Sequence, residues 1–268
     1  MQIQQFYIEC PHCGKWHVHT ELMSYTVLGN PDAWSDGKFA RDEIVEYASL
    51  QFSKCNKCTK FFWLEDCTQV NPSEIDSFLE SGTKKHTNNQ LIDRFLSANP
   101  DYATNNNLQD LNYPPPDYSL NYAEHFIPDL LNLLKNTEEL STQRELHLRL
   151  LLWQYINDFA RNAPKGFIRI FKSKHNKVGY DEKMYKSYKE TRLENLNRLL
   201  ELLQKAEGPD YEDTEIRIIE IERELGNFEK AKTLIENLDP IIEHNHKAFV
   251  NKSLKLIAKK RNQVFMVN

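Results

Sequence analysis

Two hydrophobic patterns divide this chain. Near the N-terminus, short apolar runs at residues 6–8 and 16–18 flank one group of turn-forming residues, and runs at 50–52 and 61–64 flank another. Such pairs of short runs are typical of β-hairpins. From residue 121 almost to the end, apolar residues recur at the three- and four-residue spacing of helices. The pattern predicts an α+β fold, in which a small β module precedes a larger all-α bundle.

Individual helices are predicted from periodicity and from residues that start or stop helices. Capping-box spacing from Thr142 to Glu145 predicts the start of a long helix. Gly226 predicts the turn of a helical hairpin, and a final helix from Pro240 is expected to bury Ile241 among other apolar residues. Two short helices are predicted within residues 71–96. The pattern is helical from residue 121 onward, with an apolar stretch after Pro128 and helices over 142–161, 181–206, 214–225 and 228–238.

One polar stripe interrupts the apolar surface of the helix over residues 142–161. Its members recur every four residues and therefore share one side: Glu145, Arg149, Trp153, Asn157 and Arg161. We favour a solvated face with an ion pair between Glu145 and Arg149, because such pairs are common on helices. A polar groove for a partner is the alternative interpretation.

Four cysteines form the most specific motif of the chain: Cys10, Cys13, Cys55 and Cys58. Two Cys-x-x-Cys pairs supply four thiolates to one tetrahedral ion, and each pair falls on the turn of a predicted hairpin. Gly14 suits a tight turn with positive φ, whereas Thr59 at the matching place is less suited. We expect a structural metal site for zinc. The first pair resembles that of rubredoxin, so iron is the less favoured alternative.

A long loop separates the two cysteine pairs. Residues 24–46 carry two turn-forming sequences, and Trp34, Phe39 and Tyr47 are the aromatic residues expected to anchor the loop. Large aromatic residues beside a small core are usually buried, so packing within the module is favoured. Contact with a partner is the alternative.

The domain organisation follows from a polar stretch in the middle of the chain. Residues 98–119 are rich in Asn, Asp and Tyr and include three consecutive prolines, which favour an extended spacer. We predict a zinc-ribbon domain over residues 1–70 with its long inserted loop, short helices and a linker over 71–120, and a helical domain over 121–268.

Other candidate reactive residues are few. His17 and His19 alternate on one predicted strand and could bind a second ion or replace a cysteine as ligand, although the four cysteines already complete a tetrahedral shell. Cys67 has no base beside it in the sequence, so a buried or spare thiol is favoured over a nucleophile. The sequence contains no phosphate-binding, dinucleotide-binding or His-Glu-x-x-His motif. We therefore expect no enzymatic activity.

Composition and charge limit the partners. The chain has 268 residues and a net charge of -5, which argues against a nucleic-acid-binding surface over the whole protein. Residues 165–177 form the most basic window, with interleaved aromatic residues. A solvated connection between helices is favoured there because the net charge is acidic, and nucleic-acid binding is the alternative. No apolar run is long enough for a membrane span, and the N-terminus lacks a cleavable leader. These features predict a cytoplasmic protein that does not enter membranes.

Two stretches support a resemblance to known proteins. Residues 225–231, Leu-Gly-Asn-Phe-Glu-Lys-Ala, are similar to the turn and second helix of a tetratricopeptide repeat, closed by Asp239-Pro240. Together with the cysteine turns and residues 148–161, the layout resembles a group of uncharacterised bacterial proteins with an N-terminal zinc ribbon and a repeat-like helical tail. The resemblance implies architecture and brings no catalytic activity.

The favoured function is therefore a non-enzymatic zinc-binding adaptor whose helical, repeat-like surface binds another protein. A nucleic-acid-binding protein that uses the ribbon and residues 165–177 is the first alternative. A metal-dependent enzyme is the second, and it requires an open position on the metal.

Overall fold

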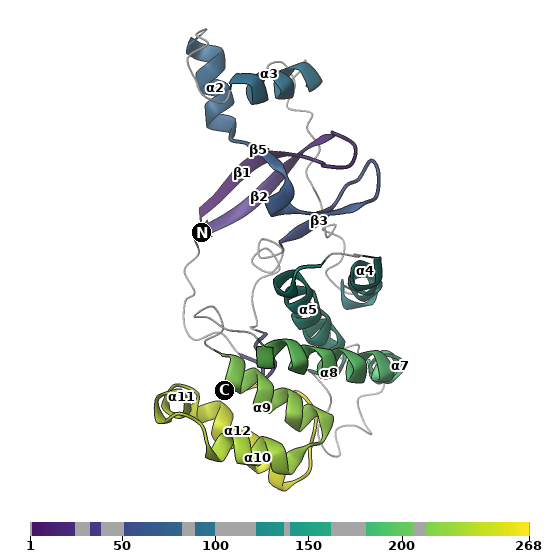
Figure 1. The fold of residues 1–268 in the computed structure, drawn as a ribbon, viewed down its shortest axis with the longest axis vertical. Coiled ribbons are helices and arrows are strands. Elements are labelled where there is room, and N and C mark those ends of the chain that lie inside the picture. The colour runs from purple at the N-terminus through teal and green to yellow at the C-terminus, as the bar shows by residue number, and fades with distance from the viewer. Residues whose placement is uncertain are drawn as a thin grey trace, which may run out of the picture. The chain divides into compact units, whose positions relative to one another are not determined.

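The protein was analysed as a computed structural model. It describes residues 2–24, 33–38, 51–81, 89–99, 122–136, 140–161, 181–205 and 213–267. The chain divides into two compact units, one formed by residues 1–29 with 41–119 and the other by residues 30–40 with 120–268. Small sheets come first and helices follow, so the fold is of the α+β type (Figure 1).

The first unit contains two small antiparallel sheets. Strands β1 (Gln2–Glu9) and β2 (Trp16–Ser24) form a hairpin, and β5 (Thr68–Val70) pairs with the other edge of β1. The second sheet is the hairpin of β3 (Phe52–Lys54) and β4 (Phe61–Trp63). The 3-10 helix η1 (Leu64–Asp66) follows β4. Each hairpin turn carries one cysteine pair, as the flanking apolar runs predicted.

Two helices cover the larger sheet. Helices α2 (Pro72–Ser81) and α3 (Asn89–Ala98) lie where the sequence predicted two short helices. They share an apolar core with the sheet, formed by Tyr7, Trp16, Val70, Ile75, Ile92 and Phe95. These helices therefore belong to the β unit. The predicted linker over 98–119 lies outside the described residues apart from its first two positions.

The second unit is helical. Its elements are α4 (Tyr122–Asn136), α5 (Thr142–Arg161), α7 (Glu182–Ser187), α8 (Lys189–Lys205), α9 (Thr214–Leu225), α10 (Phe228–Glu236), α11 (Pro240–Asn245) and α12 (Lys247–Ala258). Within the part of the chain that the structure describes, no helix has the length and apolar character needed to cross a membrane.

Three details of the helical prediction were wrong. The cap of α5 is Ser141, whose Oγ accepts a hydrogen bond from the backbone N–H of Arg144 at 3.2 Å, so the capping box was placed one residue late. The helix predicted over residues 181–206 breaks at Tyr188 into α7 and α8. The final helix breaks at His246, and Ile241 is 71% exposed because it lies on the short outer helix α11.

The helical hairpin of α9 and α10 has the predicted turn. Gly226 ends α9 with φ of 88°, a conformation that favours glycine. Ala231 of α10 is completely buried, in a cluster with Ile216 and Ile219 of α9. A small side chain at position 231 therefore allows the two helices to pack closely.

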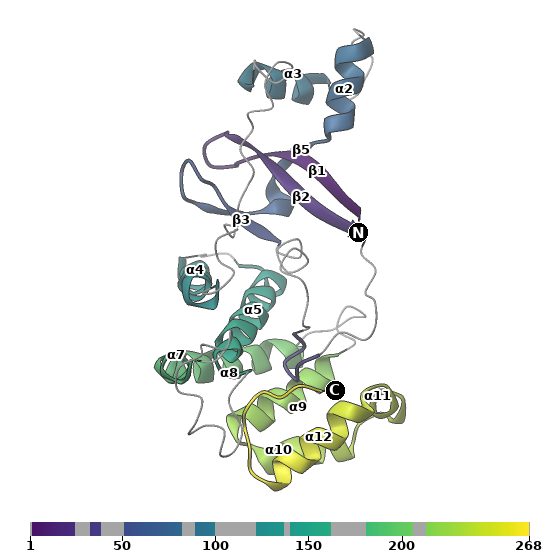
Figure 2. The ribbon, with the colours of Figure 1, turned by 180° about the vertical axis from the view of Figure 1, so that it is seen from behind.

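A short segment from the long inserted loop packs in the helical unit. We call residues 33–38 the inserted segment; Figure 2 shows it as a dark trace beside α9. Trp34 forms an antiparallel bridge with Met266, and the backbone N–H of Ser35 donates to the carbonyl of Phe265 at 2.8 Å. The favoured packing of Trp34 within the β module is therefore wrong. Phe39 and Tyr47 lie outside the described residues.

The polar stripe of α5 is interior. The ion pair between Glu145 and Arg149 exists at 2.8 Å, but Trp153 and Asn157 are completely buried and the side chain of Arg161 is 6% exposed. The favoured solvated face is therefore wrong beyond its first turn. Helices α8 and α9 and the inserted segment cover the stripe.

Polar and charged side chains from α5, α8, α9 and the inserted segment meet on this stripe. The carboxylate of Glu224 on α9 accepts hydrogen bonds from Trp153 Nε1 at 3.1 Å, Asn157 Nδ2 at 3.1 Å and Arg192 Nη2 at 2.6 Å. Asn157 Nδ2 also donates to Asp36 Oδ2 at 3.0 Å. The amide of Asn157 thus links the inserted segment to α9. The buried carboxylates of Asp36 and Glu224 both accept hydrogen bonds, as buried polar groups generally do.

A second buried pair fixes the C-terminal segment. Arg223 on α9 donates to both carboxylate oxygens of Glu220, at 2.5 and 2.8 Å. Its remaining N–H groups donate to the carbonyls of Arg261 at 2.6 Å and Gln263 at 2.8 Å. The residues after α12 therefore return along α9 and pair with Trp34 and Ser35.

Candidate metal centre

The two cysteine turns have the same backbone fold. In the first, the N–H of Cys10 donates to the carbonyl of Lys15 and the N–H of Gly14 donates to that of Cys10, both at 2.9 Å. In the second, the N–H of Cys55 donates to the carbonyl of Lys60 at 2.9 Å, and that of Thr59 to Cys55 at 2.8 Å. Each turn therefore holds its two sulfurs on the same side.

The fifth residue of each turn has a left-handed backbone. Gly14 has φ of 68° and Thr59 has φ of 60°. Glycine takes this conformation without strain, whereas a β-branched residue rarely does. The sequence-based expectation that the second turn is the less suited of the two therefore agrees with its geometry.

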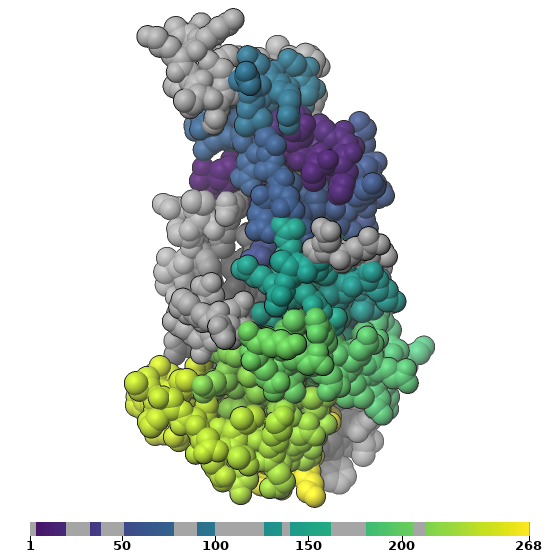
Figure 3. Space-filling view, viewed as in Figure 1, coloured from purple at the N-terminus to yellow at the C-terminus, as the bar shows by residue number. Residues whose placement is uncertain are grey.

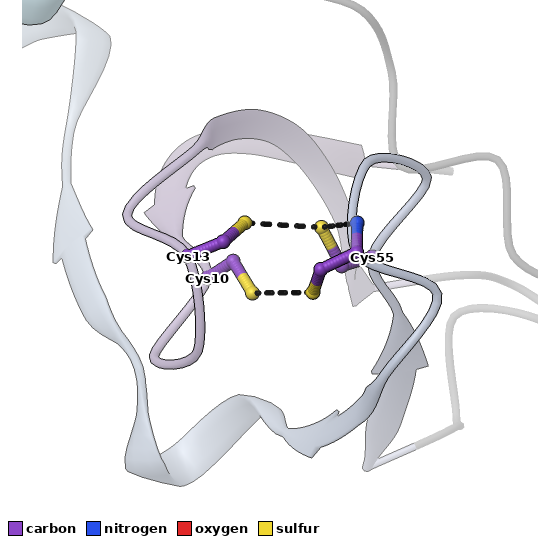
Figure 4. A group of neighbouring side chains, drawn as sticks. Cys10, Cys13 and Cys55 are labelled. Carbon is purple, nitrogen blue, oxygen red and sulfur yellow. Dashed lines mark hydrogen bonds between the residues drawn. The ribbon is translucent and has the colours of Figure 1, made fainter.

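The four sulfurs face one another between the turns, as Figure 4 shows for Cys10, Cys13 and Cys55. The Sγ atoms of Cys10 and Cys58 are 3.8 Å apart, and those of Cys13 and Cys55 are 3.7 Å apart. All four lie within 4.8 Å of one another. These separations are too long for disulfide bonds, in which the sulfurs are about 2.05 Å apart.

A metal ion fits this arrangement. Tetrahedral zinc–thiolate bonds of about 2.3 Å place neighbouring sulfurs about 3.8 Å apart. The two measured pair distances match that value, so the four cysteines form a possible metal site. An ion bound by all four sulfurs would have no tetrahedral position left for a further ligand.

Hydrogen bonds from backbone N–H groups favour the thiolate form of Cys55, the form in which a cysteine binds a metal. Burial raises the pKa of Cys55, but hydrogen bonds from the N–H groups of Cys58 and Lys57 to its Sγ, at 3.5 and 3.4 Å, oppose burial, and the pKa falls to about 7. Burial raises the pKa of Cys10 to about 12.

His17 lies beside the site. It is completely buried on β2, and its Nε2 is 3.4 Å from Cys55 Sγ. Burial lowers its pKa to about 4, so the imidazole is neutral at pH 7 and carries one N–H. When that proton is on Nε2, the ring donates a hydrogen bond to the sulfur of Cys55 and can hold this sulfur in position. His19, its predicted companion, is half-buried.

Sequence reasoning could have found this role for His17. Position 17 pairs with Ile8 across the hairpin, and Ile8 is completely buried against the cysteine cluster. A histidine that alternates in phase with buried apolar residues points toward the metal side of the strand. The alternation alone does not show which side of the strand faces the cysteines.

Cys67 does not join the four sulfurs. Its Sγ donates to the carbonyl of Trp63 at 3.2 Å, and burial raises its pKa to about 11. It packs against the same apolar cluster as the four cysteines. This agrees with a spare, partly buried thiol, because a protonated thiol is a poor nucleophile.

The basic window over residues 165–177 lies outside the described residues, so the structure places none of its side chains. Comparison with known proteins adds no further assignment: no family model, curated protein or solved structure matches this chain.

Proposed function

We propose that this protein is a non-enzymatic adaptor, in which a structural zinc ion stabilises the β unit and the helical unit binds another protein. The observation that carries the proposal is the four-sulfur arrangement, with pair distances of 3.7 and 3.8 Å. A closed thiolate shell stabilises a fold and offers no coordination position to a substrate. Zinc is preferred over iron because structural four-cysteine sites most often hold zinc.

The size of the β unit supports a structural role for the ion. Strands β3 and β4 have three residues each, and an isolated hairpin of this size is marginally stable in water. An ion held jointly by the two turns ties this hairpin to the β1–β2 hairpin. The metal then supplies stability that the short sheets lack.

The helical unit supports the adaptor role. The left-handed Gly226 and the buried Ala231 of the α9–α10 hairpin support the proposal that this hairpin is a tetratricopeptide-like repeat. Repeat-like helical pairs commonly offer extended surfaces to other proteins. On α11, Ile241 is a large apolar side chain that is 71% exposed, and we expect it to contact the protein partner. Four reduced cysteines fit a cytoplasmic location.

Metal analysis tests the first half of the proposal. We expect one zinc ion per chain after purification without added metal. Replacement by Co²⁺ should give the absorption spectrum of a tetrahedral four-thiolate complex. Cys13→Ser should change that spectrum and Cys67→Ser should leave it unchanged. A spectrum with a water or nitrogen ligand in the wild-type protein would contradict a closed site and favour the enzymatic alternative.

Cross-linking tests the second half. The purified zinc-loaded chain should form a reproducible complex with a protein from cells that express it, and the complex should be rebuilt from purified components. Ile241→Glu should weaken this complex, whereas Lys232→Gln on α10, which also changes the net charge by −1, serves as a surface control. Cross-links confined to the β unit, or catalytic turnover in a broad substrate screen, would contradict the adaptor proposal.

A further inference from the structure

The C-terminal part of the chain carries a concentrated positive charge. Residues 244–268 contain five lysines, one arginine and no acidic residue, in a chain whose net charge is -5. The helices before it hold charges of both signs. Helix α10, for example, pairs Lys230 with Glu222 and Lys232 with Glu236. The last segment therefore contains no acidic residue to balance its positive charge.

Helix α12 divides sharply into an apolar and a basic side. The residues that it buries lie on one side: Phe249, Val250, Ser253 and Ile257. Its exposed residues lie on the other: Lys247, Ala248, Asn251, Lys255 and Ala258. At 100° per residue these exposed positions span one continuous face, which the exposed Lys259 extends beyond the last turn. We call Lys247, Asn251, Lys255 and Lys259 the basic face.

The lysines of the basic face are not used inside the protein. Among the residues that the structure describes, no ion pair or hydrogen bond engages the side chains of Lys247, Lys255 or Lys259. Lys252 differs, because its Nζ donates to the carbonyl of Met266 and lies over the ring of Phe265. Lys252 therefore holds the C-terminal segment, and the other three remain available to a partner.

We propose that the basic face of α12 binds the phosphate backbone of a nucleic acid. With a rise of about 1.5 Å per residue, Lys247 and Lys259 are separated by about 18 Å along the axis. One strand of a duplex presents about five phosphates over that length, at about 3.4 Å per phosphate. The flexible side chains of three lysines can therefore each contact a phosphate. Figure 3 shows yellow atoms from the C-terminal part of the chain at the surface.

The composition of the face favours nucleic acid over a membrane. Its apolar members are Ala248 and Ala258, whereas helices that bind membranes insert large apolar side chains. Phe249, Val250 and Ile257 are buried in the bundle and cannot serve that purpose. Contacts to phosphates carry no sequence information, so an interaction confined to the phosphate backbone should be independent of base sequence.

Fluorescence anisotropy with a labelled duplex of mixed sequence tests the proposal, using the zinc-loaded full chain over about 50 to 200 mM salt. The test variant combines Lys247→Gln, Lys255→Gln and Lys259→Gln. The control combines Lys183→Gln, Lys189→Gln and Lys205→Gln, which are exposed on α7 and α8 and change the net charge equally. Both variants must match the wild-type circular dichroism spectrum.

The salt dependence gives the sharpest outcome. Each neutralised phosphate contributes about 0.9 to the slope of log affinity against log salt, so the test variant should reduce the slope by about 2 to 3. Its affinity at the lowest salt should fall by more than about tenfold. The control should retain most of the wild-type slope and affinity.

Three outcomes would overturn the proposal. One is the absence of wild-type binding at the lowest salt, and another is an equal loss in the test and control variants, which would indicate net charge alone. The third is binding to vesicles of anionic lipid, or to an acidic protein, that depends on the three lysines while the duplex is not bound. None of these outcomes affects the metal-site proposal, because the basic face contains no cysteine.

Discussion

The carboxylate of Asp36 is completely buried and receives two hydrogen bonds from the guanidinium of Arg161, at 3.0 Å from Nη1 and 2.6 Å from Nη2. The two residues are 125 positions apart in the sequence. Asp36 comes from the loop between the cysteine pairs, whereas Arg161 is the last residue of α5. The pair therefore joins a piece of the loop to the core of the helical unit.

The first prediction concerns this pair. Asp36→Ala should lower the free energy of unfolding of the helical unit by about 3 kcal/mol, because the buried guanidinium of Arg161 loses both hydrogen bonds to Asp36. Arg161→Met should have a similar effect. The double variant should lose less than the sum of the two, with a coupling of about 1 to 3 kcal/mol. Urea unfolding followed by helical circular dichroism measures all three.

A matched control separates this effect from loss of charge in general. Lys232 and Glu236 form an exposed pair at 3.6 Å on α10, and Lys232→Gln should change stability by less than about 0.5 kcal/mol. Additive losses in the Asp36 and Arg161 variants would show that the two side chains do not stabilise each other.

The second prediction concerns metal removal. A chelator, or Cys13→Ser, should unfold the β unit, because structural zinc contributes roughly 10 kcal/mol or more in small domains. The helical signal of the second unit should persist. The inserted segment should also stay protected, since it packs on α5 and the C-terminal segment. Hydrogen exchange at residues 35–38 and in β1 distinguishes the two units.

The control for metal removal is Cys67→Ser, which lies outside the four-sulfur group and should leave the β unit folded. Retention of protected β1 amides after complete metal removal would contradict a structural role for the ion. Loss of protection in the inserted segment together with β1 would show that the two units unfold as one.

The sequence predicted local features well because local chemistry determines them. The spacing within each cysteine pair determines a turn of a few residues, and Gly226 determines the turn between α9 and α10. Both kinds of turn lie where they were expected. The interior placement of Asn157 and Arg161 could not be predicted in the same way. It depends on Asp36, a residue that nothing near it in the sequence identifies as a partner.

The solvated face predicted for the polar stripe of α5 was wrong for a related reason. A stripe of polar residues on a helix usually faces water, and i,i+4 ion pairs are common there. In α5 the stripe faces other charged residues, Glu224 and Arg192, that lie on different helices. Periodicity shows which residues share a side. It does not show whether that side faces water or a complementary polar surface.

The third prediction concerns the second cysteine turn. Thr59→Gly should raise the stability of the β unit by about 1 kcal/mol, because a left-handed backbone at a non-glycine residue costs about 1 to 2 kcal/mol and part of this gain is lost to chain entropy. Gly14→Ala should destabilise the unit by a similar amount. A Cβ at position 14 would lie 3.5 Å from Glu9 Oε1, an ordinary contact, so its cost should come from backbone conformation.

Chelator competition measures this pair of variants. Thr59→Gly should release its metal more slowly than the wild type, and Gly14→Ala more quickly. A loss of stability in Thr59→Gly would mean that the hydrogen bond from Thr59 Oγ1 to the carbonyl of Cys58, at 2.7 Å, outweighs the backbone strain.

The last prediction concerns pH. Hydrogen bonds from Arg198 to both carboxylate oxygens of Glu145, with a further one from Arg149, lower the pKa of Glu145 to about 2 from its ordinary 4.5. Because the folded-state pKa is the lower one, this contribution to stability is fully present above pH 4.5. It is lost as the pH falls toward 2, as the carboxylate takes up a proton.

The difference in unfolding free energy between the wild type and Glu145→Gln isolates this contribution, since proton uptake at other groups is common to both proteins. The difference should be about 1 kcal/mol at pH 7, a reduced value because Arg198 is 39% exposed and water screens the pair. It should shrink steadily between pH 4.5 and 2.5. A difference that stays constant over that range would show that the charge of Glu145 does not stabilise the contact between α5 and α8.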